Sequence, residues 1–207
     1  MDLADQLDQL RKEIEHDDRV RENVIPMARE ATRKCSEAVK EIHRGNYEGA
    51  EEFIKEAHSV LKKAEEKCDE SDFISKNKYL DTGYQELTEA ANLLSILKDG
   101  KYTPGSEYGV LTRSYLTGLG DTIGELRRAT LDALRREEVN RAEEILGFME
   151  DILEELSGFD FPDSLIPGLR RKTDVGRRII EKTRGDVTNA VQQQHLMEQL
   201  KEFGSKL

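Results

Sequence analysis

Two pairs of acidic residues stand at spacings that bring carboxylates together on a helix. Glu86 and Glu89 are three residues apart, and Asp121 and Glu125 are four apart. Residues at these spacings share one face of an α-helix, where like charges destabilise the helix unless a cation compensates. Neither pair has a lysine or arginine at i,i+4, and only Arg128 follows Glu125 by three residues. The pairs are therefore either a solvated surface or a site that binds a cation.

Convergence of the two pairs would create an oxygen-ligand site suited to Mg²⁺ or Mn²⁺, the hard cations that carboxylates prefer. Such an ion activates water and stabilises the charge of an in-line phosphoryl displacement, which is the chemistry of a metal-dependent nuclease. Three glycines, Gly118, Gly120 and Gly124, lie near the second pair on the same predicted helix. Each costs up to about 1 kcal/mol relative to alanine, so we expect another chain segment or a ligand to approach closely there.

Other common catalytic chemistries leave no signature in this sequence. There is no Gly-x-Ser-x-Gly, no glycine-rich phosphate loop followed by Lys-Ser or Lys-Thr, and no Cys-x-x-Cys. The four histidines are scattered without metal-binding spacing. Two cysteines, Cys35 and Cys68, are too few for a disulfide framework. We expect both thiols to pack on helices in a reducing compartment.

The sequence pattern is all-α, because apolar residues recur at steps of three and four and no β-alternation extends beyond a few residues. Asp17 or Asp18 is the expected cap of the first helix, which runs to about His43 with a kink or restart at Pro26. Further helices are expected at 48–69, at 71–97 with Ser71 or Asp72 as its cap, and at 109–136, 139–156 and 170–203, with loops at 99–108 and 157–168. No linker-like gap separates them. Residues 1–207 are therefore expected to form a single domain, a bundle of about six or seven long antiparallel helices.

Charge is abundant but unevenly distributed. The 207 residues include 32 basic and 43 acidic ones, a net charge of −11 that taken alone disfavours nucleic acid and anionic membranes. Residues 137–160 carry nine acids and one base, whereas residues 19–44 carry seven bases and four acids, and residues 170–186 carry seven bases and three acids. Each run is either a solvated helix face or part of a localised charged surface. Acids facing outward and basic stretches lining an enclosed surface would reconcile the net charge with a polyanionic ligand.

Targeting signals are weak in this sequence. The N-terminus is acidic and lacks the apolar run of a signal peptide, and the longest strongly apolar stretch, residues 90–97, is too short to span a bilayer. We therefore expect a cytoplasmic protein with no membrane partner. The chain ends in Ser205-Lys206-Leu207, which matches a peroxisomal address, although so short an ending readily occurs by chance.

The two carboxylate motifs resemble those of the translin/TRAX family. Residues 85–90, Gln-Glu-Leu-Thr-Glu-Ala, are similar to the Gln-Glu-x-x-Glu-Ala of TRAX, and residues 121–128, Asp-Thr-Ile-Gly-Glu-Leu-Arg-Arg, to its Asp-x-x-Gly-Glu-Leu-x-Arg. The helix pattern extends the resemblance over nearly the whole chain. It implies an all-α subunit that assembles into a hollow octameric shell. In the family complex called C3PO, TRAX-type subunits are Mg²⁺-dependent endoribonucleases and translin subunits bind nucleic acid.

Carried over residue by residue, the metal-binding and catalytic carboxylates of the family fall on Glu86, Glu89, Asp121 and Glu125. The resemblance implies that the first three ligate Mg²⁺ or Mn²⁺ and that Glu125 joins them or orients the attacking water. Translin's histidine- and arginine-rich nucleic-acid stretch has no counterpart here, because residues 79–89 contain no basic residue. We therefore expect a prokaryotic or archaeal homologue that holds binding and cleavage in one subunit type, as a homo-oligomer and, by resemblance, a homo-octamer.

RNA, single-stranded or a short duplex, is the expected partner, with single-stranded DNA as a second candidate. The expected phosphate contacts follow from the charge distribution and are Arg19, Arg21, Arg29, Arg33 and Lys34, with Arg127, Arg128, Arg177 and Arg178 behind them. Each of these bases otherwise forms an ordinary surface ion pair. Two other functions stay open, namely a non-catalytic nucleic-acid-binding shell and a helical scaffold without a nucleic-acid ligand.

Overall fold

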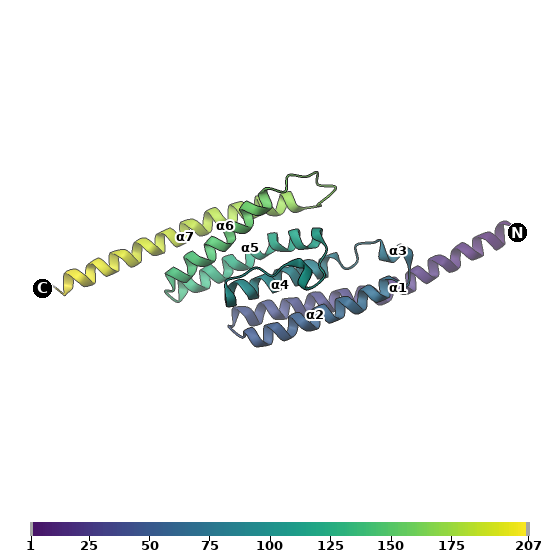
Figure 1. Cartoon of the computed structure of the whole chain (residues 1–207), viewed down its shortest axis with the longest axis horizontal. Helices are drawn as coiled ribbons and strands as arrows, with labels where there is room; N and C mark the ends of the chain where they lie inside the picture. Colours follow the sequence, from purple (N-terminus) through teal and green to yellow (C-terminus); the bar gives the residue numbers. More distant parts are fainter. Residues whose placement is uncertain (1, 206–207) are drawn as a thin grey trace. The chain divides into compact units, whose positions relative to one another are not determined.

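Helices make up the regular structure of the described chain (Figure 1). The computed structural model describes residues 2–205, so Lys206 and Leu207 of the C-terminal Ser-Lys-Leu ending lie outside the described residues. Between residues 2 and 205 there is no strand, and none of the helices is long and apolar enough to cross a bilayer. The all-α prediction is confirmed. The helices are α1 (Leu3–His43), α2 (Tyr47–Cys68), α3 (Asp72–Ser75), α4 (Asp81–Asp99), the 3₁₀-helix η1 (Gly105–Glu107), α5 (Thr112–Arg135), α6 (Val139–Ser157) and α7 (Leu169–Gly204).

The chain divides into two compact units. Unit 1 comprises residues 1–94 and 103–115, and unit 2 comprises residues 95–102 and 116–207. The division falls inside α4 after Leu94 and inside α5 after Tyr115. Each unit therefore contains part of both helices that carry the candidate carboxylates. The expectation of one domain over residues 1–207 stays a prediction.

Helix α1 begins almost at the start of the chain. The Asp2 side chain accepts a hydrogen bond from the Asp5 amide at 2.9 Å, and the Asp5 carboxylate accepts one from the Asp2 amide at 3.3 Å, so a complete capping box starts the helix. The expected cap at Asp17 or Asp18 is therefore wrong, because no helix breaker lies between this box and those residues. The helix also continues through Pro26 without a restart. Pro26 is exposed, so water can reach the carbonyl that its ring leaves without a donor.

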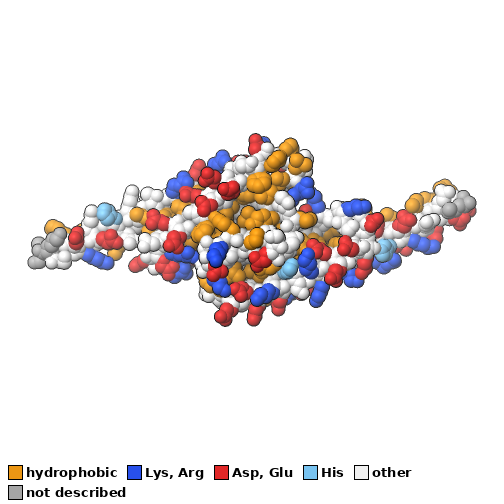
Figure 2. All heavy atoms as spheres, viewed as in Figure 1, with side chains coloured by type: hydrophobic (Ala, Val, Ile, Leu, Met, Phe, Trp, Pro, Cys, Tyr) orange, Lys and Arg blue, Asp and Glu red, His pale blue; other side chains and the backbone are white. Residues whose placement is uncertain are grey.

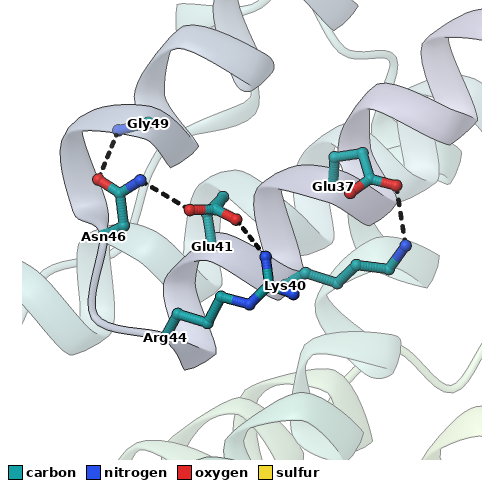
Figure 3. A network of polar contacts seen from close by, with 6 residues as sticks. All are labelled: Glu37, Lys40, Glu41, Arg44, Asn46 and Gly49. Atoms are coloured by element: carbon teal, nitrogen blue, oxygen red, sulfur yellow. Dashed lines mark hydrogen bonds and ion pairs between the residues drawn. The ribbon is translucent and has the colours of Figure 1, made fainter.

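A polar network closes the turn between α1 and α2 (Figure 3). The Glu41 carboxylate accepts hydrogen bonds from the side chains of Asn46 and Arg44, each at 2.6 Å. These bonds, first that of Asn46 and then that of Arg44, lower the pKa of Glu41. The Asn46 side chain also caps α2 by accepting the Gly49 amide at 3.2 Å. Gly45 has a left-handed φ of 79°, which lets the chain reverse. The predicted end of the first helix at residues 44–46 is confirmed.

Small side chains let α1 and α2 pack closely in the core of unit 1. Ala31, Cys35 and Ala38 of α1 are fully buried. The two helices lie side by side along α2 (Figure 1), and they are antiparallel because a short turn joins them. Both cysteines are buried free thiols on helices, as predicted. The buried positions of α2 recur at steps of three and four and are Ala50, Ile54, Ala57, Leu61, Ala64 and Cys68.

The single helix predicted over residues 71–97 is in fact two helices. Ser71 caps α3 as expected, with its hydroxyl accepting the Ile74 amide at 3.1 Å, but α3 ends after one turn. The Asn77 side-chain amide donates to the Phe73 carbonyl at 2.6 Å. It therefore takes the acceptor that its own backbone N–H would use to continue the helix. Helix α4 starts anew after this interruption.

The core of unit 2 lies among α5, α6 and α7. Helices α6 and α7 lie side by side (Figure 1). Every acid of residues 137–160 except Glu150 is exposed, as expected for an outward-facing acidic surface. The bounds of α5, α6 and α7 confirm the predicted C-terminal helices. The buried positions of α7 recur at steps of three and four and are Leu169, Thr173, Gly176, Ile180, Thr183 and Val187.

Candidate functional site

The first candidate pair, Glu86 and Glu89, lies on α4 within unit 1, and both side chains are half-buried. The fully buried thiol of Cys35 on α1 indicates where they lie. Burial raises the pKa of this thiol, and the negative charges of Glu86 and then Glu89 raise it further. Both carboxylates are therefore close enough to α1 to act on its buried face. A freely solvated surface does not describe this pair, because both side chains are half-buried.

A chain of hydrogen bonds holds the loop after α4 against this helix in unit 1. The buried Asn92 accepts the Thr103 amide through its side-chain oxygen at 3.0 Å and donates to the Thr88 carbonyl at 2.9 Å. The Tyr115 hydroxyl donates to the Thr103 carbonyl at 2.9 Å. Because Thr88 and Asn92 flank Glu89, these bonds stabilise the turns of α4 that carry the carboxylates. Sequence reasoning missed Asn92, because nothing in the local pattern of α4 reveals that its partner is a loop amide.

Asp121, on α5 within unit 2, forms a bidentate ion pair with Lys172 of α7. The Lys172 Nζ lies 2.5 Å from each carboxylate oxygen, and the Lys172 and Asp121 side chains are only 18% and 29% exposed. Gly120 permits this approach, because a Cβ there would lie 3.1 Å from the Lys172 Cβ. The predicted close approach of another segment is confirmed at Gly120. A Cβ at Gly124 would have nothing within 4 Å, so packing does not require glycine at that position.

Glu125 completes the set of half-buried carboxylates. Its side chain is 27% exposed, and its Oε2 lies 3.9 Å from Nη1 of Arg128, at the long limit of an ion pair. A pair of this length on an accessible helix face contributes little stability. The four motif carboxylates thus share a half-buried state that distinguishes them from the exposed acids of α6.

The donor chemistry of these residues suits a hard cation, and Asp121 already accepts a compact one in the form of the Lys172 ammonium. A metal ion at Asp121 has to displace this ammonium or share the carboxylate with it. Across residues 2–205, no group of three or more His, Cys, Asp or Glu side chains is arranged to hold a metal ion. Binding of Mg²⁺ or Mn²⁺ by the four carboxylates stays a prediction. Sequence reasoning placed Lys172 only in a basic segment, because no local pattern links it to an aspartate 51 residues away.

The predicted phosphate contacts on α1 separate into an exposed ridge and paired side chains. Arg19, Arg29 and Arg33 are exposed, and their spacing places them on the face opposite the buried positions of the helix. Arg21 pairs with an aspartate three residues earlier at 3.1 Å, and Lys34, 21% exposed, pairs with a glutamate of α2 at 2.7 Å. The bases at positions 40 and 44 are likewise paired (Figure 3). The ridge is the part of α1 best placed to meet a phosphate, and its role stays a prediction.

In unit 2, Arg127 ties α5 to α7. Its guanidinium donates to the Thr183 hydroxyl at 2.6 Å and to the Asp186 carboxylate at 3.1 Å, and its side chain is 18% exposed. A phosphate contact by Arg127 would therefore compete with a structural role. The exposed members of the predicted set in this unit are Arg128, Arg177 and Arg178.

Residues 2–205 form helices without a strand and carry two half-buried carboxylate pairs on the middle helices, as expected for a helical protein of the translin type. The model of the Translin family matches residues 4–184, and the chain therefore belongs to the Translin family. The resemblance seen in the two motifs is confirmed.

Known relatives and solved structures agree with this assignment. An uncharacterized protein of Methanocaldococcus jannaschii is 34% identical over 198 residues, which are 95% of this chain and 88% of the relative. The structure of AfC3PO in complex with duplex RNA matches with a TM-score of 0.79 at 34% identity, and the crystal structure of AfC3PO matches with 0.82 at 33%. Each match covers 89% of this chain and 96% of the other. The crystal structure of apo-NeC3PO, at 22% identity and a TM-score of 0.79, shares the fold.

Proposed function

We propose that this chain is a metal-dependent endoribonuclease that binds RNA, single-stranded or a short duplex, within a homo-oligomeric shell. Membership of the Translin family and the likeness to AfC3PO, whose structure includes duplex RNA, support RNA as the ligand. The observation that carries the nuclease is the half-buried state of all four motif carboxylates. Carboxylate oxygens are the ligands that Mg²⁺ and Mn²⁺ prefer, and partial burial limits the competition from bulk water.

The proposed roles follow the motifs. Glu86, Glu89 and Asp121 would ligate Mg²⁺ or Mn²⁺, and Glu125 would join them or orient the attacking water. When bound, the ion supplies the Lewis acidity that activates water and stabilises the developing phosphoryl charge. The chain itself positions the carboxylates, through the hydrogen bonds along α4 in unit 1 and the Lys172 ion pair in unit 2.

The net charge of −11 does not oppose RNA binding on this proposal. The acids of residues 137–160 other than Glu150 are exposed on and around α6, whereas the exposed arginines of the predicted set lie on α1, α5 and α7. Phosphate contacts by these arginines make the affinity fall steeply with salt. An octameric shell and single-stranded DNA as a second ligand are proposed on the resemblance alone.

Labelled RNA incubated with Mg²⁺ or Mn²⁺, with and without EDTA, tests the nuclease. Glu89→Gln and Asp121→Asn should abolish cleavage while RNA binding is retained, because each removes one charged ligand and keeps the side-chain size. Glu154→Gln, at an exposed glutamate of α6, is the matched control and should cleave like the wild type. Cleavage that survives both Glu89→Gln and Asp121→Asn contradicts the proposal and points to a contaminating nuclease.

One observation favours a second function, a non-catalytic RNA-binding shell. Lys172 already neutralises Asp121, so this carboxylate can be stable in the protein without any metal ion. In that case RNA binds with a strong salt dependence, is not cleaved, and is held equally well in EDTA. A chain that binds no RNA at any ionic strength would instead be a helical scaffold.

A further inference from the structure

The first turns of α1 carry an apolar stripe that unit 1 leaves uncovered. Leu3, Leu7, Leu10 and Ile14, here called the N-terminal stripe, are between 53% and 69% exposed, although such residues are usually buried. They recur at steps of four, three and four, which is the spacing of a coiled-coil seam. Hydrophobic side chains are visible between charged ones along these turns in Figure 2, and in Figure 1 the turns extend beyond the end of α2.

The last turns of α7 carry a second exposed apolar surface. Leu196, Met197, Leu200 and Phe203, here called the C-terminal stripe, are between 56% and 64% exposed. The buried face of α7 ends at Val187, so the turns that carry this stripe have no core of unit 2 to pack against. Apolar surface that recurs along one helix and lacks a core typically marks an interface between proteins.

We propose that the N-terminal stripe of one chain packs against the C-terminal stripe of a second copy of the same chain. Each exposed side chain offers on the order of 100 Å² of apolar surface. Every chain has both stripes and so takes part in two such contacts. Each N-to-C contact buries on the order of 400 Å² from each chain, about half of what one partner contributes to a standard interface, and the two contacts together bury on the order of 800 Å² per chain.

Charge decides which stripes pair. Residues 2–18 around the N-terminal stripe carry seven acids and two bases, whereas residues 192–207 around the C-terminal stripe carry two acids and two bases. Pairing two N-terminal stripes would bring two strongly negative helices together. Pairing two C-terminal stripes would leave both N-terminal stripes in water. The N-to-C contact covers both apolar surfaces without like-charge repulsion, and as a head-to-tail contact it can close into a ring or shell.

This inference deepens the proposed self-association and rests on it, but it does not depend on RNA binding or cleavage. Size-exclusion chromatography with light scattering, over a dilution series, measures it. Replacing Leu7 and Leu10 together by aspartate should weaken the assembly by about a hundredfold or more, since burial of each leucine contributes at least about tenfold. Gln9→Asp, which adds one aspartate at an exposed position facing away from the stripe, should leave the assembly unchanged.

Circular dichroism melts accompany the dilution series. Because the N-terminal stripe contributes nothing to the core of unit 1, the double variant should retain its helix content and its unfolding temperature when compared with a dissociated wild type. A wild-type chain that is monomeric throughout overturns both the self-association and this inference. An oligomeric wild type whose assembly resists the double substitution overturns the inference alone.

Cross-linking identifies the paired stripes. Two differently tagged chains, one with Leu10→Cys and the other with Leu200→Cys, are co-expressed and treated with a short bis-maleimide. The native thiols at positions 35 and 68 are buried and should react little. Wild-type chains treated with the same reagent in parallel measure the cross-linking that these thiols cause. Cross-links should join the two tags. Cross-links confined to pairs of Leu10→Cys chains, or to pairs of Leu200→Cys chains, refute the N-to-C contact between copies.

Discussion

Replacing Lys172 by methionine isolates the charge on which Asp121 depends. Methionine keeps an unbranched stem beside Gly120 but removes the ammonium that lies 2.5 Å from both Asp121 oxygens. The carboxylate then remains in a site where its side chain is only 29% exposed, without the cation that offsets its desolvation. We expect the free energy of unfolding to fall.

The size of this loss follows from the burial of the pair. Removing one partner of a fully buried ion pair costs about 3–5 kcal/mol, whereas exposed pairs contribute about 0–1 kcal/mol. With side chains 18% and 29% exposed, the pair lies between these limits, and we expect a loss of about 2 kcal/mol. Adding Asp121→Asn removes the charge that has lost Lys172, so the double variant should be more stable than the sum of the two single losses predicts.

Urea unfolding followed by circular dichroism measures these differences. Arg170→Met is the matched control, because Arg170 lies only two residues before Lys172 on the same helix. Its ion pair with Asp160 is on the surface, where both side chains are at least 77% exposed. Its effect should stay within about 0.5 kcal/mol. If Lys172→Met is as mild as Arg170→Met and shows no coupling to Asp121→Asn, the ion pair does not support unit 2 and the reasoning is refuted.

The same variant links stability to the proposed metal site. Once the ammonium is gone, Mn²⁺ should bind more readily near Asp121 and stabilise the folded state in proportion to its occupancy. The rise in Tm with excess Mn²⁺ should therefore be larger for Lys172→Met than for the wild type, and it should be lost in Asp121→Asn. Equal rises in all three proteins would show that Asp121 is not a metal ligand.

Three further predictions concern other described residues. Burial raises the pKa of the Cys35 thiol, so a thiol reagent should label it only after unfolding, and rapid labelling of the native protein would contradict this. Burial, and then the charge of Lys62, lower the pKa of His58 from 6.5. The unfolded chain then takes up this proton first as the pH falls below about 6.5, so stability should decrease from pH 7 to pH 5, and His58→Gln should flatten that slope. A Cβ at Gly176 would lie 2.9 Å from the Ile123 Cδ1, whereas one at Gly185 of the same helix meets nothing within 4 Å. Gly176→Ala should therefore destabilise by about 1–2 kcal/mol in urea unfolding, and Gly185→Ala should stabilise by up to about 1 kcal/mol; the reverse order would be inconsistent with the packing of α7.

Local signals in the sequence determined most of the helices. Periodic apolar residues and the expected cap at Ser71 place most helix starts close to where the structure has them, because capping and amphipathicity act between residues a few positions apart. Two of the errors arose where local signals compete. The box of Asp2 and Asp5 starts α1 before the expected cap, and the Asn77 side chain takes a helix carbonyl and ends α3.

The motif carboxylates were also found from sequence, because their spacing along a helix and their resemblance to TRAX are local properties. Their environment was decided only by tertiary structure. The half-buried state of Glu86 and Glu89 beside the Cys35 thiol depends on how α4 packs against α1. The pairing of Asp121 with Lys172 joins positions 51 residues apart, and no helical periodicity extends that far. Charge compensation acts through space, so the sequence could name the carboxylates but only the folded chain could supply the cation that one of them meets.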